Sequence, residues 1–477
     1  MKTPQKLYKR GLAIVSLLIA GISPLPAADF IWDSSPDGNW SDDTKWNSGS
    51  APSGADAVIK TPNQYGSLLV NGNFSVAGFE VAPVSTWEIQ AGTGTASLSI
   101  GTLAKSGSGI LRFRNTSTNT LSLAIGTITL AANGGQLQLG QQNETLQLDQ
   151  LAVTGTTTIG TNSTLVVNAK NATFDVIDIA SGTNTSLSIY AYKGTSASPG
   201  SGGITARGIT GGGRIYTLDA AYRYNTGTLT LDGMTNDTFS YAGRLLDTIT
   251  TNTQGGIITL SLVKTGDGVQ TLTHASNSYS GTTLIDGGTL VVNGGHTGGG
   301  QYTINGTGTL AGKGTITTAN ADVVVSGNGK LSPGDEGTGT LTLALGTGKL
   351  DLTQAGDSAL AFTFGAIATS TAVSLTSGTI EIGTGNIDLD SFSFTFVEGF
   401  GTGDYTLLAS TGSITGTLGA NLTGILNGHE VSLALSGDNT SIILSVGSAI
   451  PEPGTFTLLA GACILALVTF LRGMPRR

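Results

Sequence analysis

The chain has 477 residues, of which 72 are glycine, roughly twice the usual share of about 7%. Charged residues make up only 11%, whereas a soluble globular domain carries about 25%. The two ends are basic: setting aside their seven basic residues and one acid from the totals of 22 and 31 leaves 15 basic and 30 acidic residues between them. A body this acidic excludes nucleic acid as a partner, because it repels a phosphate backbone.

Residues 1–28 have the layout of a secretory signal peptide. Four basic residues among the first ten precede the apolar run Gly11–Ile22, and Ala27 and Ala28 form a small-residue exit. Twelve apolar residues are too few to span about 30 Å of hydrocarbon at 1.5 Å each. We therefore expect a cleaved signal helix, with an uncleaved N-terminal anchor as the alternative.

Residues 29–60 hold three of the four tryptophans, Trp32, Trp40 and Trp46. The terminal unit of a repeat protein has an open apolar end that must be covered. The tryptophans are therefore predicted to form the core of an N-terminal cap. The alternative is a set of aromatic side chains that stack on sugars.

Residues 61–354 are predicted to form a β-solenoid, because short alternating Val, Ile, Leu and Thr runs are separated by Gly, Asn, Asp and Ser. A Gly-x-Leu element recurs in steps of 20, 21, 10 and 9, beginning at Gly288, Gly308, Gly329, Gly339 and Gly348. A period near 20, sometimes halved, indicates one coil per period, with each coil stabilised by its neighbours. A stacked meander or a series of β-sandwiches is the structural alternative.

A longer repeat relates residues 103–110 (LAKSGSGI) to residues 262–269 (LVKTGDGV). The second copy and its continuation through residues 262–345, together with residues 30–60, resemble the autotransporter-associated β-strand repeat. That resemblance implies a right-handed parallel β-helix exposed at the cell surface. The expected fold is therefore all-β.

Residues 355–447 read as a further β region, and residues 448–477 as a sorting tail. Within the tail, Pro451, Glu452 and Pro453 precede the apolar stretch Phe456–Leu471, which is followed by the basic residues Arg472, Arg476 and Arg477. Sixteen apolar residues span roughly 24 Å, which predicts a single short transmembrane helix with its arginines in the cytoplasm. Cys463 lies within this span and is interpreted as a small packing residue.

The three parts of the tail, in this order, resemble the PEP-CTERM sorting signal. The resemblance implies cleavage by an exosortase, transient tethering in the inner membrane of a Gram-negative bacterium, and delivery to the cell surface or extracellular matrix. Extracellular polysaccharide is the further partner that it implies. Pro451, Glu452, Pro453, Arg472, Arg476 and Arg477 would form the sorting motif.

No catalytic, cofactor-binding or metal-binding residues are predicted. Lys264-Thr265-Gly266 imitates a β-lactamase motif, but it recurs as Lys105-Ser106-Gly107 and is interpreted as structural. The three histidines are far apart, and the close acidic pairs lack calcium-loop spacing. We expect a non-enzymatic structural or adhesin-like surface protein; the alternative is a β-helix that binds or degrades polysaccharide.

Overall fold

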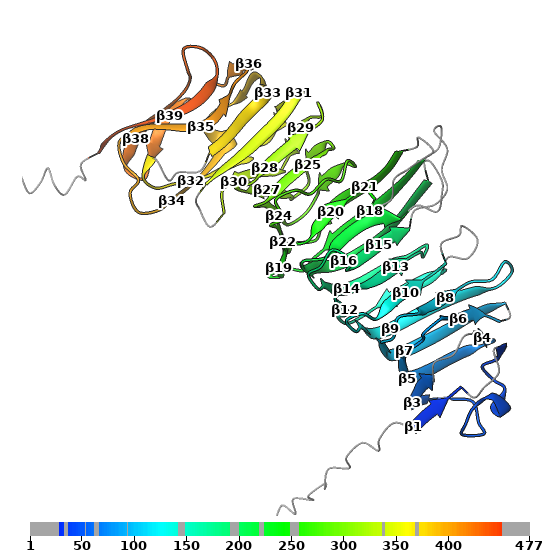
Figure 1. The fold of residues 1–477 in the computed structure, drawn as a ribbon. Helices are drawn as coiled ribbons and strands as arrows, with labels where there is room; N and C mark the ends of the chain where they lie inside the picture. The colour runs from blue at the N-terminus through cyan, green and yellow to red at the C-terminus, as the bar shows by residue number, and fades with distance from the viewer. Residues whose placement is uncertain are drawn as a thin grey trace, which may run out of the picture.

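The computed structural model describes residues 28–32, 37–52, 54–61, 66–92, 94–141, 148–190, 200–218, 224–248, 257–335, 339–367 and 372–450. Over these residues the chain winds into an elongated stack of coils, from β1 at one end to β36 near the other (Figure 1). No α-helix occurs in the described residues, and the short helical elements η1 (Asp43–Lys45) and η3 (Leu389–Ser391) are 3-10 turns.

Three ladders of parallel strands run along the stack, and a full coil contributes to each. The first ladder includes β11 (Gln150–Val153), β18 (Tyr224–Asp232), β21 (Ile257–Thr265), β23 (Thr283–Ile285), β26 (Tyr302–Ile304), β29 (Val323–Gly327) and β36 (Ile414–Leu418). The second includes β1 (Ala28–Ile31), β12 (Thr157–Ile159), β19 (Thr238–Tyr241), β22 (Val269–Leu272), β24 (Thr289–Val292), β27 (Thr309–Gly312), β30 (Lys330–Pro333), β32 (Leu360–Phe364) and β34 (Phe392–Phe396).

The third ladder includes β2 (Asp37–Asn39), β4 (Gly66–Val70), β6 (Thr86–Ala91), β8 (Ile110–Arg114), β10 (Gly135–Leu139), β13 (Ser163–Val167), β15 (Ser186–Tyr190), β17 (Arg214–Leu218), β20 (Arg244–Leu246), β25 (Gly295–Gly299), β28 (Thr315–Thr318) and β35 (Gly403–Ser410). Bridges from Leu246 to Ser278 and from Asn277 to His296 connect β20 to β25. The third ladder therefore continues past the point where its regular strands are interrupted.

Long strands serve two ladders at once. Six of them pass from the first ladder to the second: β3 (Gly54–Thr61), β5 (Asn73–Val81), β7 (Thr95–Lys105), β9 (Thr120–Leu130), β14 (Ala172–Ile179) and β16 (Gly200–Gly211). The two halves of β9, for example, pair with the separate strands β11 and β12. Two later strands, β31 (Thr340–Ala355) and β33 (Ala372–Ile387), pass from the third ladder to the first.

The register confirms a parallel solenoid and the predicted coil length in its middle part. Along the first ladder Leu262 pairs with Thr283, Thr283 with Tyr302, and Tyr302 with Val323, so each step is close to the spacing of the Gly-x-Leu elements. Leu290, Leu310 and Leu331 of the first three of these elements lie in register on the second ladder. Coils elsewhere are longer, since Leu229 pairs with Leu262 in a step that exceeds the middle period by more than half.

The halved steps of the Gly-x-Leu pattern are not half-coils. Leu341 and Leu350 both belong to β31, but they lie on the third and first ladders respectively. The same motif therefore appears on all three ladders, because each ladder needs a glycine turn followed by an inward-facing Leu. For the elements at Gly339 and Gly348, motif spacing alone therefore does not give the coil length.

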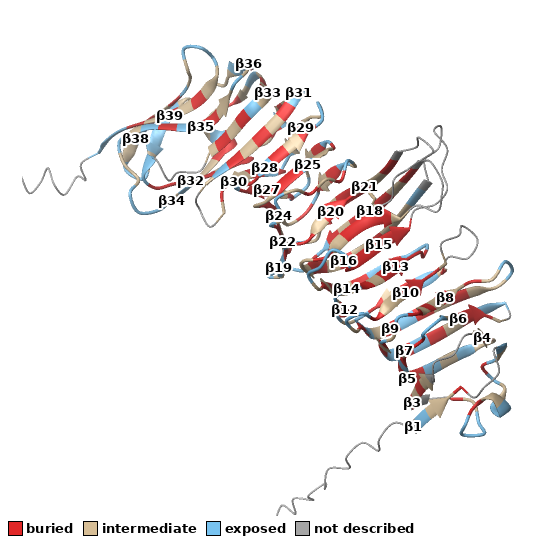
Figure 2. Ribbon diagram, in the orientation of Figure 1, coloured by how far each residue is buried: buried red, intermediate tan, exposed pale blue. Residues whose placement is uncertain are grey.

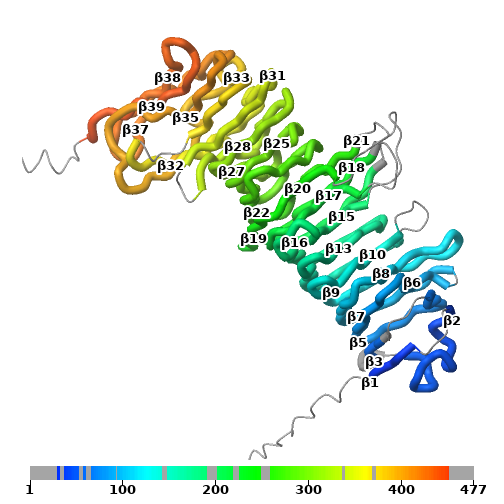
Figure 3. The backbone as a smooth tube through the Cα atoms, in the orientation of Figure 1, coloured from blue at the N-terminus to red at the C-terminus, as the bar shows by residue number. Residues whose placement is uncertain are grey.

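Inward-facing side chains of the three ladders fill the interior, as the alternation of buried and exposed residues along the strands requires (Figure 2). In β7 the side chains of Leu98, Ile100 and Leu103 are buried. Each aliphatic side chain stacks on its counterpart in the next coil, as Leu103 does on Ile128. Successive coils lie upon one another along the parallel part of the tube (Figure 3). A coil is thus stabilised mainly by its two neighbours.

Turns between ladders bring backbones close together. Gly288 has a φ of +58°, and a Cβ atom placed on it would lie 2.4 Å from the carbonyl oxygen of Gly268 in the preceding coil. A left-handed backbone and an approach this close both require glycine. The predicted role of glycine at the coil corners is seen directly at this position.

The two ends of the stack differ. At the N-terminal end Trp32, Trp40 and Trp46 are almost fully buried, and Trp46 packs edge to face against both of the others. At the C-terminal end β35 pairs antiparallel with β39 (Ser441–Ala449), and β39 pairs antiparallel with β38 (His429–Leu435). β38 in turn pairs antiparallel with β37 (Thr423–Leu426). The three parallel ladders continue past residue 355 and end at β36, β34 and β35 respectively.

Candidate functional site

The predicted sorting residues lie outside the described part of the chain. This applies to Pro451, Glu452, Pro453, Arg472, Arg476 and Arg477, as well as to Cys463 and all but the last residue of the predicted signal peptide. Within the described ranges, no helix has the length and apolar character needed to cross a bilayer. The candidate functional site is the repeat at β21–β24.

A buried lysine holds the corner between β21 and β22. The side chain of Lys264 is 1% exposed, and its ammonium group donates to the carbonyl oxygens of Thr265, Gly266 and Gly287. Burial lowers the pKa of Lys264 to about 8, so the side chain remains mostly charged at neutral pH. The lysine thus ties together two successive turns of the solenoid.

The same corner is built a second time, in β7. Lys105 is also 1% exposed and donates to the carbonyl oxygens of Ser106, Gly107 and Gly134. Burial lowers its pKa to about 8, as for Lys264. The long sequence repeat therefore encodes a lysine-filled corner, and the Lys-Thr-Gly triplet is structural.

A second polar feature lies inside the solenoid, across β23, β25 and β26. The ring of His296 stacks on that of Tyr279 with centroids 4.1 Å apart. Nε2 of His296 is 2.7 Å from the carbonyl oxygen of Tyr279 and donates to it, while Nδ1 accepts from the hydroxyl of Tyr302 at 2.9 Å. The hydroxyl of Tyr279 is 2.8 Å from that of Thr283. These four residues form a fully buried polar cluster around a neutral imidazole.

The order of these residues along the chain hides the cluster from sequence analysis. His296 lies between Tyr279 and Tyr302, and only the winding of the chain places all three side chains together. The sequence feature that could have indicated the cluster is the coil period, because Tyr279 and Tyr302 are separated by little more than the length of one coil. Burial lowers the pKa of His296 to about 4 and raises the pKa values of both tyrosines.

The buried imidazole makes stability depend on pH. The unfolded chain binds a proton near pH 6.5 and the folded chain near pH 4, so protons favour unfolding between these values. Lowering the pH from about 7 to about 4.5 is expected to cost roughly 2 kcal/mol through this group. Urea unfolding at the two pH values measures the loss. His296→Gln should reduce it, whereas His429→Gln at a half-buried position should not; equal losses in all three proteins would contradict the assignment.

One comparison with known proteins matches this region. Residues 262–292 match the passenger-associated-transport-repeat family. The match begins in β21 with Leu262, includes Lys264 and Tyr279, and ends with Val292 at the end of β24. It confirms the predicted autotransporter-type repeat over these residues. No curated protein matches the chain.

The matched segment covers one complete winding and the start of the next. It passes through β21 and β22, crosses the third ladder near Asn277, and returns through β23 and β24. Asn277 is buried; its side-chain oxygen accepts from the backbone N–H of Leu245, and its amide nitrogen donates to the carbonyl oxygens of His274 and Gly295. The repeat therefore contains both the lysine that holds its corner, Lys264, and the residue that takes the place of a third-ladder strand, Asn277.

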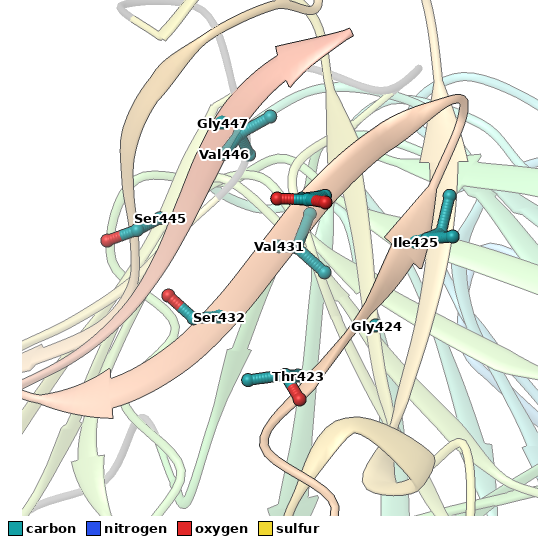
Figure 4. Close-up of a pocket in the computed structure, with 9 residues that line it drawn as sticks. Thr423, Gly424, Ile425, Val431, Ser432, Ser445, Val446 and Gly447 are labelled. Atoms are coloured by element: carbon teal, nitrogen blue, oxygen red, sulfur yellow. The ribbon is translucent and has the colours of Figure 1, made fainter. Parts of the chain in front are cut away.

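One hollow lies at the C-terminal end, on the sheet formed by β37, β38 and β39 (Figure 4). It has a volume of about 580 Å³ and is lined mainly by small and apolar side chains such as Thr423, Ile425 and Val446, with Glu430 as the ionisable lining residue. Among the described residues, no three His, Cys, Asp or Glu side chains gather closely enough to hold a metal ion. The hollow therefore presents a single carboxylate, and no paired acid and base lines it.

Proposed function

We propose that the chain is an exported surface or matrix protein with a structural or adhesive, non-enzymatic role. The observation that carries the proposal is the continuous parallel stack from β1 to β36 with a passenger-type repeat at its centre. Repeats of this kind bury a core only by stacking, and the result is a long polar surface suited to weak multivalent contacts. The winding is proposed to be right-handed, the usual sense for parallel β connections.

The proposed route to the surface uses both ends of the chain. Residues 1–28 would direct export, and residues 448–477 would hold the protein in the inner membrane of a Gram-negative bacterium. An exosortase would then cleave at Pro451-Glu452-Pro453 and release the body to the surface or the polysaccharide matrix. The resemblance of the tail to PEP-CTERM signals supports this step. A surface β-helix that binds or degrades polysaccharide is the alternative.

Replacing Pro451, Glu452 and Pro453 by alanine should trap the protein in the inner membrane. The reason is that the processing enzyme would lose the extended segment that it recognises, while the apolar stretch Phe456–Leu471 stays intact. Membrane fractionation and mass spectrometry of the C-terminus measure retention and cleavage. Glu430→Ala, a change at an exposed residue of β38, is the control and should be processed normally. Normal release of the triple variant would show that Pro451-Glu452-Pro453 is not the segment that the processing enzyme recognises.

Turnover of polysaccharide would overturn the non-enzymatic part of the proposal. The decisive assay offers acidic and neutral glucans and uronans to the purified full chain. Saturable turnover that one carboxylate substitution abolishes would establish the degrading alternative.

A further inference from the structure

A second hollow follows the edge of the third ladder, and four successive coils line it. It has a volume of about 310 Å³, within the range of small-ligand sites. Its walls come from the turn at Gly182 and Thr183, the turn before β17, the start of β20, and the turn after β22. The ionisable side chains that line it are Arg214, Arg244 and His274, and no carboxylate lines it.

Arg214 and Arg244 are direct neighbours in register on β17 and β20. Their next residues, Ile215 and Leu245, are also register partners and are fully buried, so the two arginine side chains point outward. Adjacent strands are only about 4.8 Å apart, and like charges placed directly opposite one another are destabilising. A negatively charged group bound between the two guanidinium groups would relieve this repulsion.

The other arginines of the described part differ from Arg214 and Arg244 in their partners. Each pairs with a carboxylate: Arg112 and Arg114 with Glu88, and Arg207 with Asp175 and Asp237. No ion pair is formed by Arg214 or Arg244 with any described residue. Arg244 donates from Nη2 to the hydroxyl of Ser278 at 2.8 Å, and its Nε is buried without an acceptor.

His274 and the glycine turn complete the hollow. Nδ1 of His274 accepts from the backbone N–H of Ser276 at 3.0 Å, which leaves Nε2 available as a donor to a ligand. A Cβ atom on Gly213 would lie 2.3 Å from a methyl carbon of Ile179, and one on Gly212 would lie 2.4 Å from the hydroxyl oxygen of Ser181. The turn must therefore stay free of side chains, which keeps the arginines accessible from this side.

We propose that Arg214, Arg244 and His274 bind an oxyanion carried by a saccharide, either a uronic-acid carboxylate or a sulfate ester. Two guanidinium groups and an imidazole N–H offer the planar, multidentate donors that such groups accept. The body carries about twice as many acidic as basic residues, so a dense polyanion such as nucleic acid is repelled. A glycan with isolated acidic sugars meets the site without that penalty.

The inference rests on the proposed matrix role for its biological meaning, but binding and export are separable. A chain that binds but is not exported refutes the proposed function alone. A chain that is exported but does not bind refutes this inference alone.

Calorimetry on the purified full chain tests the site with four probes: a uronic-acid trisaccharide, a sulfated trisaccharide, a neutral trisaccharide of the same length, and inorganic phosphate. We expect one of the two acidic sugars to bind, with the neutral sugar at least tenfold weaker. The arm that binds identifies the oxyanion as carboxylate or sulfate. Phosphate should compete only weakly, because it lacks the sugar contacts. Equal binding of the neutral sugar would overturn the inference.

Variants locate the site. Arg214→Gln and Arg244→Gln should each weaken binding about tenfold, and the double variant should abolish it. Arg214→Lys, which keeps the charge but loses the planar donor pair, should lie between the wild type and Arg214→Gln. Lys330→Gln, an exposed lysine on β30, is the charge-matched control and should bind normally. Circular dichroism verifies that each variant is folded, and unchanged affinity in a folded double variant would overturn the proposal.

Discussion

Lys264→Met is expected to lower the free energy of unfolding of the central coils by about 3 kcal/mol. Methionine has similar length and fills the space, but it cannot donate to the carbonyl oxygens of Thr265, Gly266 and Gly287. Buried acceptors that lose their donor cost roughly 1–3 kcal/mol each. Part of this loss is offset, because the charged ammonium no longer has to be held out of water. The net effect remains destabilising, since the carbonyl groups stay where the backbone places them.

Peptide-resolved hydrogen exchange is the appropriate measurement for this variant. Each coil contacts only its neighbours, so the loss should appear first in β21–β24 and spread outward along the stack. All four tryptophans lie before residue 90, so their fluorescence reports on a distant part of the chain. Lys105→Met should produce the same loss of protection near β7 and β8, and its effect should be independent of that of Lys264→Met.

Lys330→Met provides the control, because Lys330 is exposed on β30. Its exchange pattern and unfolding midpoint should match the wild type within about 0.5 kcal/mol. If Lys264→Met were as stable as Lys330→Met, the corner would be held by its backbone alone. The repeated lysine in the sequence would then need another explanation.

The sequence predicts the winding of this chain well because each coil is built from local signals. Alternating residues indicate strands, glycines mark the corners, and the spacing from Gly288 to Gly308 to Gly329 fixes the coil length of the middle part. These features depend on a few neighbouring residues and on one repeating distance. They can therefore be recognised in the sequence without knowledge of the three-dimensional structure.

The contents of the site depend on which residues successive coils bring together, and this is harder to predict. His296 meets Tyr279 and Tyr302 because the coils in the middle part are short and nearly equal in length. Arg214 and Arg244 lie side by side because the coil between them is longer than the coils of the middle part. No regular sequence motif indicates the length of that coil. Variable coil length breaks the link between sequence spacing and spatial proximity. The halved Gly-x-Leu steps mislead for the same reason.

Trp40→Ala is expected to destabilise the N-terminal end of the solenoid by about 3–5 kcal/mol. The indole of Trp40 is fully buried, stacks on Phe74 with centroids 5.1 Å apart, and packs against Trp46 at 5.6 Å. Its Nε1 donates to the carbonyl oxygen of Pro52 at 3.0 Å. Alanine would leave a cavity and an unsatisfied carbonyl group. The loss falls on the end of the described stack, where the indole covers the interior of the following coil.

The expected signature is fraying rather than global collapse. Hydrogen exchange and limited proteolysis should accelerate between β3 and β5, while β21–β24 remain protected, because repeat stability is a sum of neighbour terms. Trp40→Phe should recover part of the loss by refilling the cavity without restoring the hydrogen bond to Pro52. Val84→Ala, at a side chain 58% exposed in the same region, should change little. Uniformly faster exchange along the whole chain would mean that the solenoid unfolds as one cooperative unit, and that the tryptophans are not a local cap. A wild-type exchange pattern in Trp40→Ala would leave the aromatic cluster without a structural role and return attention to its alternative as a sugar-stacking surface.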